Sequence, residues 1–442
     1  MADQRLEEDR LSQLPDPLIC QILSHLPTKD SVTTSVLSTR WRTLWLWVPC
    51  LDLAYWEILD FNHFRSFGDR FFDSSRASFI NKVKLRIEDC YDVKVDTCYL
   101  KSWIDAAVKR KIQHLHVCCP PDTSYEMPPS LYTCETLVSL KLYEVVMLDD
   151  VESFFLPSLK TLHLKFIWYG KESIFESLVS RCPILEKLKI VGSEYGNVNV
   201  FQVLSTSLKK LCIKIEIDDP NFGLGFVIGA PRLRFLSITD KFETCILNEL
   251  SSGGKVDISL PFVLEDLNEA SISLRRSGVI NSFLPGISKV RDMTICKDIF
   301  KLICQYSKKE LLPQFGYMSR LHLTLRVSDL YMLPTFLESC PNLKSLILVW
   351  NSNSKKMRQE ELSGFDSSVP ECLLSSLEYV DIKTTISGRD AEWKLIMYFL
   401  ENSTILKKLT LRLNYFCTDE KFLVKNILEI PRRSTTCQVV IY

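Results

Sequence analysis

The stretch Cys182-Pro183-Ile184-Leu185-Glu186-Lys187-Leu188-Lys189-Ile190 decides the fold. Its apolar anchors occupy the first, fourth and sixth places of an L-x-x-L-x-L pattern that returns along most of the chain. Close copies have their anchors at Leu137/Leu140/Leu142, Leu159/Leu162/Leu164, Leu208/Leu211/Ile213, Leu233/Leu236/Ile238, Leu343/Leu346/Leu348, Leu377/Val380/Ile382 and Leu406/Leu409/Leu411. Looser copies are Ile80/Val83/Leu85, Ile112/Leu115/Val117, Leu267/Ala270/Ile272, Val290/Met293/Ile295 and Met318/Leu321/Leu323. The chain is thus predicted to consist of repeated units of one kind.

Each unit is predicted to be a helix, a turn and a short strand. The last two anchors alternate with polar residues, as on a strand with one buried face. Ahead of the quoted stretch, residues 171–181 place their apolar side chains on one helical face, and Pro183 disfavours helix at Cys182. First anchors about 22 to 26 residues apart fit the period of leucine-rich repeats. The predicted fold is therefore α/β: a curved leucine-rich-repeat solenoid with parallel strands on the concave face and helices outside. An ordinary α/β domain with this spacing by chance is the alternative.

Composition limits the class of protein. The chain has 442 residues, of which 46% are hydrophobic and 24% charged, and such a composition is globular. Its 54 basic and 54 acidic residues cancel, which argues against a dedicated nucleic-acid or membrane partner. No signal peptide opens the sequence and no apolar run reaches the roughly 20 residues of a membrane span, so a cytoplasmic and/or nuclear location is expected.

The sixteen cysteines form no C-x-x-C pair, which argues against a metal site. Cys134, Cys182 and Cys340 each stand three residues before a first leucine anchor. We expect them to be small buried apolar residues at one repeat position. A disulfide framework is the alternative, and the lack of a secretion signal disfavours it.

Residues 11–47 are built differently, as three short helices. Asp16 is placed to cap the first helix, and Thr28 to cap the second after Pro27. The expected apolar stripes are Leu18/Ile19/Ile22/Leu23/Leu26 on the first helix, Val32/Val36/Leu37 on the second and Trp41/Leu44/Trp45 on the third, Thr39–Trp47. So small a unit cannot bury all these side chains internally, which indicates a surface for a partner.

This segment resembles a plant-type F-box. The resemblance rests on Leu14-Pro15-Asp16, on the run from Ile22 to Asp30 and on the run from Val36 to Trp45. It implies docking on the Skp-type adaptor of a cullin ubiquitin ligase. The docking face that it implies consists of Leu14, Pro15, Leu18, Ile19, Ile22, Leu26, Trp41 and Leu44. Some of these side chains can instead hold the bundle together or pack on the first repeat, and we expect that of Trp45 and Trp47.

The C-terminal segment, from Val369-Pro370-Glu371-Cys372-Leu373-Leu374 to the strand pattern Leu406–Leu411, resembles the FBD domain of plant F-box/leucine-rich-repeat proteins. The order F-box, repeats and FBD covers almost the entire chain. The predicted organisation is an F-box at 8–54, a connector that caps the solenoid at 55–79, leucine-rich repeats at 80–350, a linker at 351–368 and the FBD, a repeat-like C-terminal cap, at 369–442. Gln438–Ile441 is expected to add a last edge strand.

No catalytic constellation is found in the sequence. His114 and His116 share one strand face, but no third metal ligand stands near them. Gly253-Gly254-Lys255 is not a phosphate loop, because Val256 stands where serine or threonine is needed. We therefore predict no catalytic residue, no metal and no cofactor. In a ligase complex the chemistry would belong to the partner proteins.

The polar positions beside the strand anchors predict a basic stripe over the first repeats. It comprises Lys82, Lys84, Arg86, Lys141, Lys165, Lys187, Lys189, Lys210 and Lys214, with His114, His116 and His163. The corresponding positions of later repeats hold Glu269, Asp292 and Asp381 beside Arg320, Lys408 and Arg412. The hypothesis is that Lys141, Lys165, Lys187, Lys189, Lys210 and Lys214 receive an acidic or phosphorylated target segment. A solvated lysine face without a ligand is the alternative.

The function predicted from the sequence is that of an adaptor that presents a protein target for ubiquitination. Two alternatives belong to other classes. One is a protein-interaction scaffold outside any ligase. The other is a receptor whose small ligand completes the target surface, since some plant F-box repeat proteins hold a hormone or an inositol phosphate there.

Overall fold

The computed structural model describes residues 11, 13–58, 60–74, 79–87, 98–120, 125–147, 154–169, 172–192, 200–215, 225–239, 244–259, 280–351, 369–386, 390–413 and 420–442. The chain divides into two compact units, Met1–Val198 and Asn199–Tyr442. Each unit is described by itself below.

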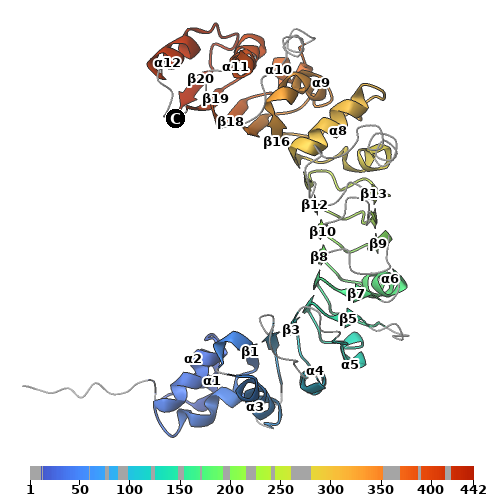
Figure 1. Ribbon diagram of the computed structural model, residues 1–442, viewed down its shortest axis with the longest axis vertical. Helices are drawn as coiled ribbons and strands as arrows, with labels where there is room; N and C mark the ends of the chain where they lie inside the picture. The colour runs from blue at the N-terminus through green and yellow to red at the C-terminus, as the bar shows by residue number, and fades with distance from the viewer. Residues whose placement is uncertain are drawn as a thin grey trace, which may run out of the picture. The chain divides into compact units, whose positions relative to one another are not determined.

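The first unit begins with helices and continues as alternating strands and helices (Figure 1). Its helices are α1 (Asp16–Leu23), α2 (Thr28–Thr33), η1 (Thr34–Val36), η2 (Trp41–Trp47), η3 (Tyr55–Glu57), α3 (Phe61–Phe72), α4 (Cys98–Lys109), α5 (Pro129–Tyr132) and α6 (Glu172–Ser180). Its strands are β1 (Cys50–Ala54), β2 (Lys82–Arg86), β3 (His114–Cys118), β4 (Ser139–Tyr143), β5 (Val146–Met147), β6 (Thr161–Lys165), β7 (Trp168–Tyr169) and β8 (Lys187–Gly192).

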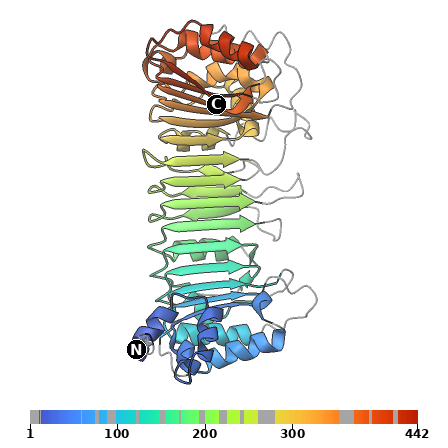
Figure 2. The same ribbon diagram turned by 90° about the vertical axis from the view of Figure 1, so that its left-hand side faces the viewer.

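The main sheet of this unit is a parallel stack in the order β1-β2-β3-β4-β6-β8, and its arrows all point one way in Figure 2. The anchors meet in register: Leu140 opposes Leu162, and Leu162 opposes Leu188. All three are at most 1% exposed. Helices α4, α5 and α6 lie on one side of the sheet (Figure 1), so each strand buries one face and leaves the other open. This is the predicted solenoid architecture.

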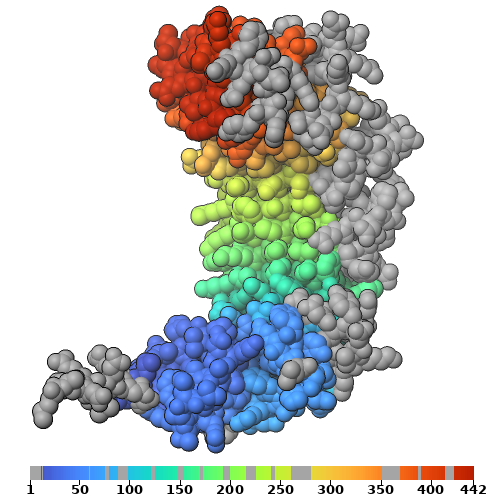
Figure 3. Space-filling view, turned by 60° about the vertical axis from the view of Figure 1, so that its left-hand side comes forward, coloured from blue at the N-terminus to red at the C-terminus, as the bar shows by residue number. Residues whose placement is uncertain are grey.

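The predicted connector belongs to the same packed body. Strand β1 pairs with β2, so the segment after the helical bundle begins the sheet. Helix α3 packs on α4 through aromatic rings: Phe64 lies 5.9 Å and Phe72 5.5 Å from the ring centre of Trp103. The dark and lighter blue atoms of Figure 3 form one continuous surface for this reason.

The second unit repeats the strand pattern and adds more helix toward its end. Its strands are β9 (Val200–Leu204), β10 (Lys210–Ile215), β11 (Gly225–Gly229), β12 (Phe235–Thr239), β13 (Cys245–Ile246), β14 (Lys255–Ser259), β15 (Asp292–Ile295), β16 (Arg320–Arg326), β17 (Ser345–Asn351), β18 (Tyr379–Ile386), β19 (Lys408–Leu413) and β20 (Gln438–Ile441). Its helices include η5 (Pro285–Ile287), α8 (Lys297–Ser307), η6 (Val327–Met332), α9 (Leu333–Leu337), α10 (Glu371–Ser375), α11 (Asp390–Asn402) and α12 (Glu420–Glu429).

The main sheet of the second unit is also parallel, in the order β10-β12-β14-β15-β16-β17-β18-β19-β20. The expected last edge strand is confirmed, since β20 pairs with β19. The loose anchor sets at Val290 and Met318 are buried as fully as the close ones. Most of the predicted linker, from residue 352 on, lies outside the described residues.

One repeat strand was not predicted. The copy expected at Leu267, Ala270 and Ile272 lies outside the described residues, and β14 stands between β12 and β15 instead. Its inward residues Val256 and Ile258 are at most 1% exposed. Gly253 occupies the place of the first anchor and adopts φ +84°, a conformation that favours glycine over leucine. A pattern search for leucine therefore misses this unit.

Candidate docking and target-binding surfaces

The N-terminal helices form a small bundle with its own core. Ile19 and Leu23 of α1 pack with Trp41, Leu44 and Val48 of the η2 region. The two core residues of α1 are four positions apart, so they lie on the same side of the helix. The remaining apolar residues of α1 must therefore face outward.

The outward face bears an apolar stripe. Leu18, Ile22 and Leu26 follow one another at intervals of four residues and are 47%, 42% and 42% exposed. Pro15 is exposed on the turn that opens the same helix. Clustered exposed aliphatic side chains of this size mark contact surfaces in proteins. We name Pro15, Leu18, Ile22 and Leu26 the docking stripe.

The structure divides the predicted docking face into surface and support. Pro15, Leu18, Ile22 and Leu26 are exposed, and Leu14 is half-buried against the bundle core. Ile19, Trp41 and Leu44 are 0%, 6% and 4% exposed. These three side chains are inside the bundle, where they support the exposed stripe, and their role in adaptor contact stays a prediction.

The second helix is shorter than its predicted stripe. Helix α2 ends at Thr33, and Val36 and Leu37 follow in and after a 3₁₀ turn. These two side chains are 83% and 66% exposed and lie beyond the end of α2, whereas the sequence predicted them on the second helix with Val32. They are functional candidates that the sequence placed on the stripe of the second helix without deciding whether they face outward. The surplus of apolar residues in so small a unit was the available signal.

Polar contacts of the bundle also differ from expectation. Asp16 caps no helix; its carboxylate accepts from Arg40 Nε at 2.9 Å. Thr28 makes no cap either, and its hydroxyl accepts a hydrogen bond from the backbone N–H of Asp52 at 2.7 Å. Asp52 lies on β1, so this bond ties the bundle to the first strand of the sheet.

Aromatic packing strengthens that tie. Trp45 is 4% exposed and stacks on Phe67 of α3 with 4.9 Å between ring centres. The guanidinium of Arg70 lies 5.7 Å from the Trp45 ring centre. Trp45 therefore packs on the connector, whereas the sequence predicted that it holds the bundle together or packs on the first repeat. Trp47, for which the same was predicted, is 51% exposed. These contacts join the bundle that bears the docking stripe to the connector and to the first strand of the sheet.

The open face of the first sheet carries a row of basic side chains. The strand register aligns Lys84 of β2, His116 of β3, Lys141 of β4, His163 of β6 and Lys189 of β8 as successive neighbours. We name these five residues the basic row. At the β1 end of the row, Asp52 opposes Lys84, and their side chains form an ion pair at 3.2 Å.

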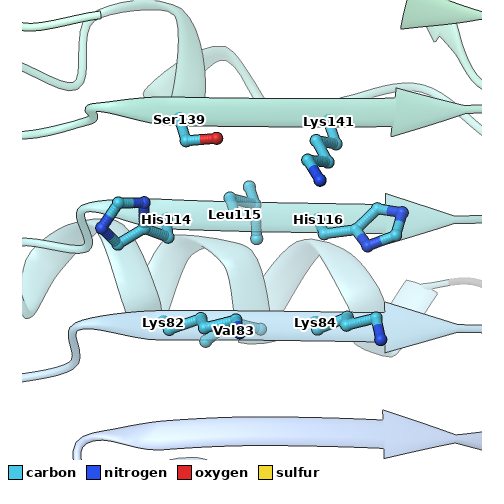
Figure 4. A pocket seen from close by; sticks show the side chains of 8 residues that line it. All are labelled: Lys82, Val83, Lys84, His114, Leu115, His116, Ser139 and Lys141. Atoms are coloured by element: carbon cyan, nitrogen blue, oxygen red, sulfur yellow. The ribbon is translucent and has the colours of Figure 1, made fainter. Parts of the chain in front are cut away.

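Described residues of the first unit line hollows on its surface, and two of these bear on function. One opens on the basic face, has a volume of about 510 Å³, and is lined by Lys82, Lys84, His114, His116, Ser139 and Lys141 with Val83 and Leu115 (Figure 4). The other, of about 320 Å³, lies between α2, β1, η3 and α3, with Val32, Leu53 and Phe67 among its lining residues.

The two histidines of the row are held in the neutral form. Burial, followed by the nearby charge of Lys141, lowers the pKa of His116 to about 4. Burial and the charge of Lys189 likewise lower the pKa of His163 to about 4. The ring of Tyr143 packs edge-on between the two imidazoles, 4.7 and 4.8 Å from their centres. Its hydroxyl lies 2.7 Å from His163 Nδ1.

These pKa values predict an acid-sensitive first unit. An unfolded histidine takes up a proton near pH 6.5, whereas His116 and His163 resist protonation until about pH 4. The stability that they confer is present above pH 6.5 and is lost as the pH falls toward 4. After allowance for the partial exposure of both rings, the loss should be about 1 kcal/mol for each.

The measurement is urea unfolding at pH 7.5, 5.5 and 4.5. Between the extremes, the wild type should lose about 2 kcal/mol more than the variant with His116→Asn and His163→Asn. Carboxylates that titrate in this range are common to both proteins and cancel in the difference. Equal losses would contradict the burial of these rings as neutral groups.

The lysines predicted to bind a target are distributed over both units. Lys141 and Lys189 share the basic row, and Lys187 and Lys165 lie in the rows on either side of it. Lys165 is drawn over the ring of Phe166, 5.0 Å from its centre. Lys210 and Lys214 lie on β10 of the second unit, where Lys210 covers Phe235 at 4.5 Å.

Charges on the corresponding face of the second unit pair with each other. Arg320 Nε lies 2.8 Å from Asp292, and Arg412 Nη1 lies 2.7 Å from Asp381. Glu269 lies outside the described residues. In the described part of the first unit, by contrast, Lys141 and Lys189 have no ion pair, and β2, β3, β4, β6 and β8 contain no acidic residue.

Among the described residues, no group of three or more histidine, cysteine or acidic side chains could hold a metal ion. The described cysteines are free thiols. Burial raises the pKa of the Cys182 thiol to about 12 and that of Cys340 well above its usual value, so both behave as the predicted apolar filler. No described helix is long and apolar enough to cross a membrane.

Comparison with protein families matches three segments of the chain. A model of the F-box domain matches residues 11–53, and a model described as FBD-associated F-box protein At5g56370, LRR repeats, matches 100–256. An FBD model matches residues 366–411. These matches follow the predicted order, and the residue boundaries given from the sequence stay predictions.

Full-length relatives come from Arabidopsis thaliana. The chain is 59% identical to the putative FBD-associated F-box protein At5g53635 over 97% of its own length and 99% of the relative. It is 49% identical to the putative F-box/FBD/LRR-repeat protein At2g05300 over 99% and 98%, and 41% identical to the F-box/FBD/LRR-repeat protein At5g22660 over 99% and 97%. The chain belongs to the plant family of F-box/FBD/LRR-repeat proteins.

Proposed function

We propose that this protein is a non-catalytic adaptor of a ubiquitin ligase in the cytoplasm or the nucleus. Its F-box docks on a Skp-type subunit, and its repeat face presents a protein target for ubiquitination. The observation that supports docking most strongly is the exposed stripe of Leu18, Ile22 and Leu26 on a folded F-box. Three large aliphatic side chains facing water are favourable only where a partner covers them.

The division of the first unit into two surfaces supports the recruitment role. The docking stripe follows α1 and the turns at its two ends, while the open face of the sheet bears the basic row. Because Trp45 and Thr28 tie the F-box to the sheet, a docked adaptor and a bound target would be held at a fixed separation. Ubiquitin transfer by a neighbouring enzyme requires such positioning of the target.

The test mixes the purified full chain with a purified Skp-type adaptor and analyses the mixture by size-exclusion chromatography. We expect a one-to-one complex that then joins a cullin and its RING partner. If the chain binds the adaptor but no protein that it captures in cells becomes ubiquitinated, the result would favour a scaffold function outside any ligase. Absence of a complex with the folded chain would remove the ligase function.

A further inference from the structure

The basic row has a regular alternation of side chains that appears only when the strands are aligned in register. Along the row, lysine and imidazole alternate: Lys84, His116, Lys141, His163, Lys189. Each imidazole thus stands between two lysines from the neighbouring strands, and Lys141 is shared. The row therefore offers two similar positions for an anion, one over His116 and one over His163; they differ in that Lys84, beside His116, is already paired with Asp52.

The spacing of these positions is set by the sheet. His116 and His163 are two strand steps apart, because β4 lies between β3 and β6. Strands are about 4.8 Å apart, so the two positions are about 10 Å apart. An extended chain in the polyproline conformation advances about 9.3 Å in three residues and returns the same face to the surface. A segment crossing the strands would place anionic groups three residues apart over the two imidazoles.

The unpaired positive charge of the row favours phosphate at these positions. The described part of the first sheet supplies no ionic partner to Lys141 or Lys189, whereas Lys84 is paired with Asp52. A phosphoryl group brings nearly two negative charges and three acceptor oxygens, more than a carboxylate can offer.

We propose that the basic row binds a segment of the target protein bearing two phosphorylated residues three positions apart, the first over His116 in the hollow and the second over His163. This inference rests on the proposed function, because it names the class of target that the adaptor would recruit. Phosphorylation of the target would then act as the signal for its capture.

The test measures fluorescence anisotropy of a proline-rich synthetic peptide of about ten residues with the full chain. Four labelled forms are compared: phosphoserines three apart, phosphoserines adjacent, a single phosphoserine, and none. The form with three-residue spacing should bind at least about tenfold more tightly than the adjacent form, and the unphosphorylated peptide should not bind measurably. Equal binding of both doubly phosphorylated forms would overturn the proposed register.

Variants assign the binding to the row. Lys141→Glu should lower the affinity for the doubly phosphorylated peptide at least about 30-fold, because this lysine lies beside both anion positions. Lys189→Glu should lower the affinity for the doubly phosphorylated peptide but change the affinity for the singly phosphorylated peptide by no more than about twofold. Lys101→Glu, an equal change of charge at an exposed position of α4, is the matched control and should have no effect. An equal loss with Lys101→Glu would show unspecific attraction and overturn the proposal.

Two further arms complete the design. Inorganic tripolyphosphate, used as competitor, should displace the peptide only at much higher concentration. If tripolyphosphate binds more tightly than every peptide, the ligand of the row is a free polyphosphate and the proposed target segment is excluded. Lys141→Gln, with circular dichroism like the wild type, repeats the test without a new charge. All variants should keep adaptor binding, so failure of this inference is distinguishable from failure of the proposed function.

Discussion

Replacing Ile22 with aspartate is expected to weaken binding of a Skp-type adaptor at least about 100-fold, or about 2.7 kcal/mol. The side chain lies in the middle of the docking stripe and is 42% exposed in the free protein. In the complex, the new carboxylate would be buried against an apolar surface without a partner, which is strongly unfavourable. Isothermal titration calorimetry with the purified adaptor measures the change.

The free variant should stay folded, because exposed positions tolerate substitution within about 0.5 kcal/mol. Leu311→Asp is the matched control: Leu311 is 97% exposed in the second unit and should not affect adaptor binding. By contrast, Leu23→Ala removes a side chain from the bundle core and should lower the stability of the F-box by about 2 to 5 kcal/mol. Wild-type affinity of Ile22→Asp would exclude the stripe as the docking surface.

The junction of the connector helix α3 with the repeat helix α4 should give the largest change in stability. Trp103 of α4 is 2% exposed, packs between the rings of Phe72 and Tyr99, and donates a hydrogen bond from Nε1 to Asp69 at 2.8 Å. Trp103→Ala is expected to cost about 3 to 5 kcal/mol, because the neighbouring rings cannot close so large a cavity. Urea unfolding followed by circular dichroism measures this loss.

A double-mutant cycle with Gly68 tests the same junction more sharply. A Cβ at Gly68 would overlap the indole ring of Trp103. Gly68→Ala alone should therefore destabilise the protein by about 1 to 3 kcal/mol, although alanine favours helix. In the Trp103→Ala background the overlap is gone, and the same substitution should stabilise the protein by about 0.5 to 1 kcal/mol. The same sign in both backgrounds would contradict the packing of α3 on α4.

The repeat architecture was predictable because its signal is redundant. Each unit buries three anchors at fixed spacing, so loose copies such as Ile112/Leu115/Val117 could be aligned with close ones, and they are buried in the same way. The unit of β14 escaped because Gly253 replaces the first anchor. One missing side chain hides a strand from a pattern search, whereas backbone pairing with β12 and β15 still specifies it.

The sites were predictable only in outline. Sequence reasoning identified the apolar surplus of the F-box but could not decide which side chains face outward, because the early end of α2 at Thr33 turns Val36 and Leu37 to the surface. It also identified a basic stripe without its pairing partners. Whether a lysine is neutralised depends on contacts across strands, such as that of Lys84 with Asp52, which lie 32 residues apart in sequence.

Hydrogen–deuterium exchange of the full chain, with and without a saturating Skp-type adaptor, tests the central claim most directly. The account predicts slower exchange in the F-box helices α1 and α2 and in the turn through Leu37, with unchanged exchange in β3, β4, β6 and β8. The target face would then remain free while the adaptor is docked. Protection from exchange that is confined to those repeat strands would contradict the account. So would unchanged exchange of the F-box in a sample where the complex has been shown to form.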